Sequence, residues 1–160
     1  MTISKTGFAV ITVMAALALL LFQVNVSQAD NSLKLQVLGP PAGVKVGTQF
    51  SLTIKAYNFQ TSAVTFNRVV VGYVNPDLSV KGPLLVSSVS RTVPAGTRPN
   101  PWDPVTPGVL TFAVPFTIVP TEPPLPANTI LPIMVTLWNN AYTAGNERGA
   151  GAGGVKIIVP

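Results

Sequence analysis

The sequence contains neither cysteine nor histidine, and charged residues make up only 9% of its 160 residues. The common nucleophile–base pairs of hydrolases and the thiolate and imidazole ligands of metal sites are therefore missing. The five acidic residues fall at a terminus or in predicted loops, with no pair close in sequence. We therefore expect a protein that is not an enzyme and that needs no metal or cofactor.

Positive charge is in modest excess, with ten Lys and Arg against five Asp and Glu, but it is scattered along the chain. No basic run is interleaved with aromatic residues, so nucleic acid is not an expected partner. The excess predicts only a weak general attraction to anionic polymers of the cell envelope.

Residues 1–29 have the three parts of a secretory signal peptide. Lys5 supplies the positive segment, and the uncharged apolar segment spans residues 7–22. Ser27 and Ala29 are the small residues that signal peptidase requires before a cut. We expect cleavage after Ala29, which leaves one domain, 30–160, in the periplasm, at the cell surface or outside the cell.

Two other fates of the leader remain open. The apolar segment is near the lower length limit for spanning a bilayer, so an uncleaved leader would tether the protein to a membrane. Residues 5–8, Lys-Thr-Gly-Phe, also resemble the processing site of type IV prepilins, where the cut follows the glycine and leaves an apolar helix. Thr12 stands where such helices carry glutamate in bacteria. This resemblance implies a pilin-like filament subunit.

After residue 30 no helical periodicity is found, and the 16 prolines and 13 glycines of the chain disfavour long helices. Short β-rich runs recur between turn clusters, and the predicted strands are 33–37, 49–57, 65–74, 84–93, 109–119, 129–138 and 155–159. The run 49–57 alternates most clearly, with Phe50, Leu52, Ile54 and Ala56 on one face. Seven strands, each antiparallel to its neighbours, predict a sandwich of two packed sheets.

In strand number and spacing, and in the form of runs 50–57 and 131–138, residues 33–159 resemble bacterial secreted immunoglobulin-like and fibronectin-type-III-like modules. Some of these modules belong to cell-surface adhesion proteins. The cysteine pair of antibody domains is absent here. The resemblance implies an immunoglobulin-like sandwich with a structural or adhesive role, although such a fold hosts many functions.

Two predicted loops, 94–108 and 139–154, exceed the usual hairpin length. In the fibronectin-type-III strand order they would lie at the same end of the sandwich, where recognition often resides. The candidate binding residues are polar or aromatic side chains of these loops: Arg98, Trp102, Asp103, Asn139, Asn140, Tyr142 and Arg148. Aromatic rings beside amide and guanidinium groups suit glycans or peptides, which is the alternative function.

Other interpretations compete at two places. Trp102, between Pro101 and Pro104, could instead plug the end of the core, and the general tendency of tryptophan to be buried favours this plug. The glycine-rich run 149–154 is predicted to be a flexible loop before the last strand. Such a hinge would let that strand pair with the sheet edge of a neighbouring copy, so the expected partners are the protein itself or envelope glycans and proteins.

Overall fold

The computed structural model describes residues 32–75, 80–120, 122, 124–143 and 145–159, and the predicted leader 1–29 lies outside them. Throughout this described part the regular elements are strands, which confirms the all-β prediction. The ten strands are β1 (Leu33–Leu38), β2 (Val44–Lys45), β3 (Gln49–Asn58), β4 (Val64–Phe66), β5 (Arg68–Val74), β6 (Val80–Ser87), β7 (Arg91–Val93), β8 (Gly108–Thr117), β9 (Ile130–Trp138) and β10 (Glu147–Val159).

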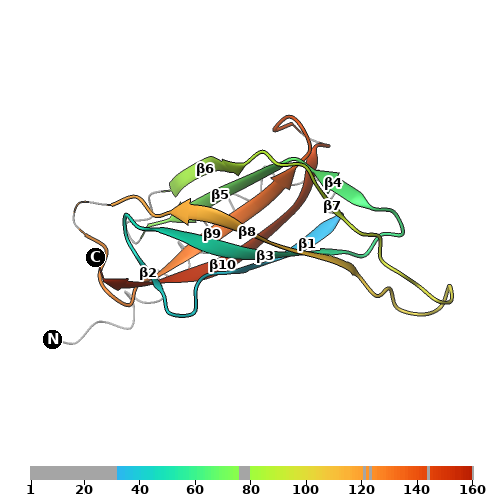
Figure 1. The fold of residues 1–160 in the computed structure, drawn as a ribbon, viewed down its shortest axis with the longest axis horizontal. Coiled ribbons are helices and arrows are strands. Elements are labelled where there is room, and N and C mark those ends of the chain that lie inside the picture. The colour runs from blue at the N-terminus through green and yellow to red at the C-terminus, as the bar shows by residue number, and fades with distance from the viewer. Residues whose placement is uncertain (1–31, 76–79, 121, 123, 144, 160) are drawn as a thin grey trace, which may run out of the picture.

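Eight of the strands form one mixed sheet. Its order is β6-β5-β9-β10-β1-β3-β8, and β2 pairs with β10. The sheet curls into a half-barrel (Figure 1), which brings β5 opposite β8, and the rings of Tyr73 and Phe116 meet there edge to face at 5.9 Å. The short strands β4 and β7 form a separate pair.

The prediction that neighbouring strands are antiparallel fails at two junctions. Both β1 and β2 run parallel to β10, while β1 also pairs antiparallel with β3. The physical reason is that β1 and β10 lie at opposite ends of the described chain. Residue alternation shows which side of a strand is buried, but not which distant strand lies beside it.

The predicted buried faces of the long strands are confirmed. Leu52, Ile54 and Ala56 of β3 are buried, and so are Phe112, Val114 and Phe116 of β8 and the alternate residues of β9, whereas Phe50 and Leu110 on the same faces are partly buried against the core. Two runs predicted as single strands are divided, at Asn67 and after Ser87. The chain turns at Asn67, where the backbone N–H donates to the carbonyl oxygen of Trp138.

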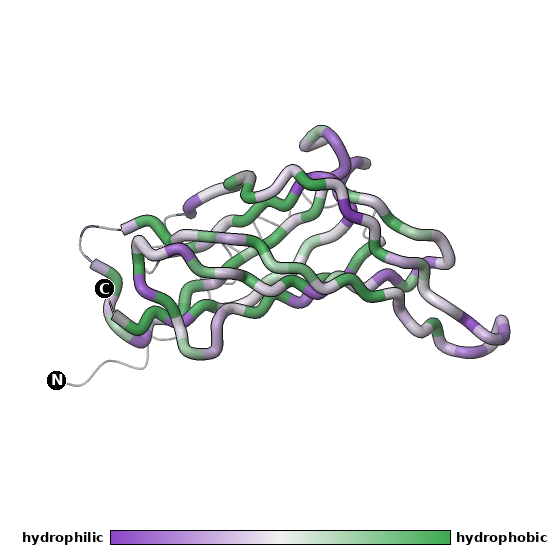
Figure 2. Tube along the Cα trace, in the orientation of Figure 1, coloured by the Kyte–Doolittle hydropathy of each residue, from purple (hydrophilic) through white to green (hydrophobic). Residues whose placement is uncertain are grey.

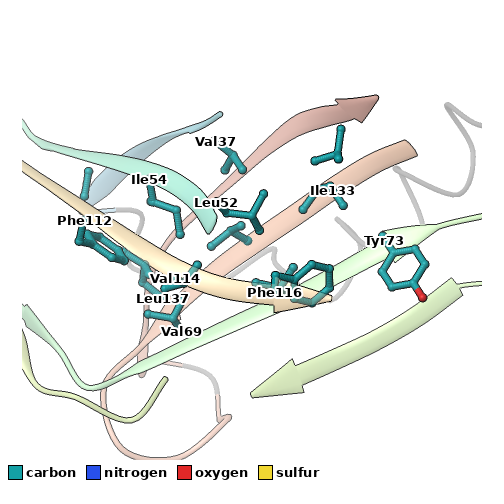
Figure 3. Close-up of a cluster of buried hydrophobic side chains, with 14 of the residues drawn as sticks. Val37, Leu52, Ile54, Val69, Tyr73, Phe112, Val114, Phe116, Ile133 and Leu137 are labelled. Carbon is teal, nitrogen blue, oxygen red and sulfur yellow. The ribbon is translucent and has the colours of Figure 1, made fainter. Parts of the chain in front are cut away.

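The core lies inside the curl, between the two halves of the sheet (Figure 3). Phe112 and Phe66 contact each other there with ring centroids 5.5 Å apart, and the backbone N–H of Val119 donates to the Tyr73 hydroxyl at 3.0 Å. Hydrophobic residues follow the strands, whereas the segments at one end of the molecule are more hydrophilic (Figure 2). The apolar core therefore holds the fold without disulfide bonds.

The predicted flexible loop 149–154 is wrong, because these residues form the middle of β10, between β9 and β1. A Cβ atom on Gly151 would lie 2.5 Å from the Cβ of Leu35 and 2.7 Å from its carbonyl oxygen. Gly149 faces Leu33 and Gly153 faces Val37 in the same way. The alternate glycines let β1 approach β10 closely, and glycine at such positions is a known means of curving a sheet.

We therefore expect Gly151→Ala to destabilise the protein by about 1–3 kcal/mol, because the added methyl group meets backbone that cannot retreat without opening the β1–β10 junction. Urea unfolding of the purified protein measures the effect. Ala152→Val on the exposed opposite face of β10 is the matched control and should change stability far less. Equal losses in the two variants would contradict a steric requirement for glycine.

Candidate functional site

The strand registers place three connections at one end of the half-barrel. Asn58, the last residue of β3, pairs with Gly108, the first residue of β8, and Trp138 of β9 pairs with Glu147 of β10. The segments 59–63 and 94–107 and the described residues of 139–146 therefore begin at the same end of the sheet; in Figure 1 the yellow segment 94–107 extends to the right, whereas the dark orange loop after β9 rises at the top. Both predicted long loops thus start at this end, but the second is shorter than expected, because residues 147–154 belong to β10.

The segment 94–107, here called the finger, is a hydrogen-bonded projection between β7 and β8. Thr97 and Thr106 bond each other through both backbone N–H groups, at 2.8 and 2.9 Å. The finger thus leaves the half-barrel as a paired ribbon and returns directly into β8 (Figure 1). Five prolines and this pairing restrict its conformations.

The base of the finger is fixed by the side chain of Asn58, which is fully buried. Its Nδ2 donates to the carbonyl oxygens of Ser62 and Pro94, at 2.8 and 2.9 Å, and its Oδ1 accepts from the backbone N–H of Gln60. Gly96 then donates its N–H to the carbonyl oxygen of Gln60 at 2.8 Å. One buried amide thereby joins the finger to the turn after β3, because a buried polar group must find partners.

Trp102 lies at the tip of the finger and is 94% exposed. The plug interpretation is therefore wrong, because the finger extends away from the end of the core. The polar groups at the tip bond one another: Asn100 Nδ2 donates to Asp103 Oδ2 at 2.7 Å, and Arg98 Nη1 donates to the Pro101 carbonyl oxygen at 3.1 Å. These bonds shape the turn and leave the indole ring as the large apolar surface presented to solvent.

The loop 139–146 is organised around Tyr142, which is 48% exposed. Its ring meets Trp138 edge to face at 5.6 Å, and the guanidinium of Arg68 lies 5.0 Å from the ring centroid. Trp138 donates its indole N–H to Thr136 at 2.7 Å, so its ring belongs to this outer cluster and lies outside the core.

Polar groups of the same loop are engaged with neighbours. Asn67 donates from Nδ2 to Asn140 Oδ1 and accepts from the Asn140 backbone N–H, at 2.9 and 2.7 Å. Asn139 donates its backbone N–H to Asn146, and Arg148 donates to the carbonyl oxygen of Gly145. These contacts connect the described residues of the loop to one another and to Asn67.

The structure thus divides the seven candidate residues into two groups. Arg98, Trp102 and Asp103 lie on the finger, while the other four lie in or beside the loop 139–146, and Figure 1 shows the two segments pointing in different directions. Sequence reasoning missed Asn58, Asn67 and Arg68. For Asn67 and Arg68 the sequence did hold a signal, since these two polar residues interrupt an otherwise apolar run.

Glu147 is buried rather than exposed in a loop, with 3% of its surface accessible. Its Oε1 atom has no hydrogen-bond partner among the described residues. Burial removes water from the carboxylate and raises the pKa of Glu147 above its ordinary value of 4.5. The folded protein therefore holds this proton more tightly than the unfolded chain does.

We expect the free energy of unfolding to fall as the pH rises above 4.5, because the unfolded chain then releases the Glu147 proton more readily than the folded protein. Below that pH the Glu147 carboxyl is protonated in both the folded and the unfolded protein, so burial of a charged carboxylate no longer lowers the stability. Glu147→Gln should remove this part of the pH dependence in urea unfolding at pH 4 and pH 7. Glu122→Gln, at an exposed carboxylate, is the control. Parallel stability profiles for wild type and Glu147→Gln would contradict the assignment.

No family model matches the chain, and a search of curated proteins also finds no match. Across the described ranges, Asp and Glu do not gather in the groups of three or more that could hold a metal ion. The same residues include no helix of the length and apolar character needed to cross a membrane.

Proposed function

We propose that this chain is an exported, non-enzymatic module with an immunoglobulin-like β-sandwich, and that it serves a structural or adhesive role at the cell envelope. Its contact site is the tip of the finger. The observation that carries the proposal is the exposed Trp102 on a braced projection.

The strand order supports the immunoglobulin-like part of this proposal. Strands β6, β5, β9 and β10 form one half of the sheet, and β1, β3 and β8 form the other, with the core between them. The first strand pairs with both β10 and β3, so it links the two halves. This pattern is compatible with two facing layers of a sandwich.

The finger supports the adhesive role because it presents an aromatic side chain that loses little conformational entropy when a partner binds it. Tryptophan is enriched among the residues that dominate binding energy, since its large rigid ring loses few rotamers when it is buried by a partner. Here the surrounding polar groups are bonded within the tip. The indole ring is therefore the group at the tip best suited to contact an envelope glycan or protein.

We expect Trp102→Ala to lower binding to isolated cell envelopes by roughly tenfold or more, because it removes the apolar contact of the tip. Co-sedimentation of the purified protein with envelopes measures the bound fraction. Pretreatment of the envelopes with periodate or with protease distinguishes a glycan from a protein as the surface bound. Trp102→Phe keeps an aromatic ring and should retain part of the binding.

Tyr142→Ala is the matched control for envelope binding, because it removes an exposed ring from the other loop at the same end of the sheet. It should bind envelopes as the wild-type protein does. The stability of Trp102→Ala should equal that of wild type, since the ring has few contacts to lose. Wild-type binding by Trp102→Ala, or no binding by the wild-type protein, would overturn the proposed function.

Export is tested separately by amino-terminal sequencing of the protein purified from the producing cells. A start at Asp30 is the expected result, because Ser27 and Ala29 provide the small residues before the cut. A start at Phe8 would instead support the pilin-like alternative. A start at Met1 or Thr2 would indicate a membrane anchor.

A further inference from the structure

The last strand is already paired on both sides within its own chain. β10 bonds β9 along one edge and β1 and β2 along the other. Within the described strands of the large sheet, the free edges belong to β6 and β8. Self-association by strand pairing would therefore use one of these two edges.

The edge of β6 carries features that disfavour strand addition. Its sequence, VKGPLLVS, has a lysine at 81 and a proline at 83, and Gly82 adopts a φ of 111°. The pairing of β6 with β5 also shifts register at two places. Lysine, proline and irregular pairing at an edge disfavour the docking of another strand.

The edge of β8 has fewer such features. It is ten residues long, its sequence GVLTFAVPFT has no charged residue, and its described strand partner is β3 alone. The register with β3 is regular from end to end. The start of the finger covers Gly108 and Pro115 lies near the far end, so within 109–114 the alternate residues whose N–H and C=O groups point away from β3 are the ones an incoming strand can pair with.

We infer that β8 is a self-association edge, at which β8 of a second copy pairs antiparallel about a twofold axis. An antiparallel pair of identical strands is self-complementary, as a twofold interface requires. The protein carries a net charge of +5, yet β8 contributes none of it, so the two β8 strands themselves bring no like charges together; the nearest cation in register, Lys55, lies on β3 beside Thr111. The outward residues Thr111 and Ala113 are small and exposed and permit close approach.

This pairing has a geometric consequence. The finger enters β8 at its first residue, so two antiparallel β8 strands carry their fingers at opposite ends of the dimer. Each dimer presents two Trp102 tips and can bridge two surfaces, or engage one surface twice if the spacing allows.

The experiment measures molar mass by light scattering over a concentration series of the purified, naturally processed protein. We expect the mass to rise toward twice that of one chain. The double variant Thr111→Lys/Ala113→Lys places four like charges at the junction and should weaken the dimer by about tenfold or more. The control Ser88→Lys/Ser90→Lys adds the same charge at exposed residues outside the strands and should dimerise as wild type does.

Single cysteines locate the contact, since the chain has none of its own. Val109→Cys, Thr111→Cys and Ala113→Cys each place a thiol along β8, and at least one should form a disulfide-linked dimer on oxidation, while Ser88→Cys should not. Trp102→Ala should dimerise normally, which separates this inference from the adhesive role of the tip. A concentration-independent monomer, or a dimer unaffected by the double lysine variant, would overturn the inference.

Discussion

Three alternate glycines of β10 allow β1 to lie against it, and the curl of the sheet depends on that approach. At Gly149, Gly151 and Gly153 a Cβ atom would meet the backbone or Cβ of the β1 residue alongside. Because β1 also pairs with β3, this junction joins the two halves of the sheet around one core. Any side chain here would push the halves apart, so the apolar faces on both sides rely on it.

At the end of the sheet where β3 stops, the core positions the finger and its exposed Trp102. The last residue of β3, Asn58, is buried and bonds both the following turn and the start of the finger. Thr97 and Thr106 then extend the pairing outward, so Trp102 is held away from the half-barrel. If β8 pairs with a second copy, the strand that anchors the finger also sets the direction of the two tips, and adhesion and assembly share one element.

Much of the strand pattern could be predicted, because apolar and polar residues alternate along a strand that is buried on one face. The faces of β3, β8 and β9 followed from Leu52, Phe112, Ile133 and their alternate neighbours. The candidate site was less predictable. Trp102 was expected to be buried from the general behaviour of tryptophan, but hydrogen bonds between Thr97 and Thr106 carry it outward. Glu147 was placed in a loop, because its burial depends on chain segments distant in sequence.

The sequence by itself determined the all-β class, the absence of cysteine and histidine chemistry, and which residues of each long strand face the core. These properties depend on composition and on local alternation. Only the tertiary structure decided that β1 and β2 run parallel to β10, that 149–154 is an inner strand, and which edges of the sheet stay free. The physical reason is that glycine lacks a side chain, so its role at a close approach appears only once the neighbouring strand is in place.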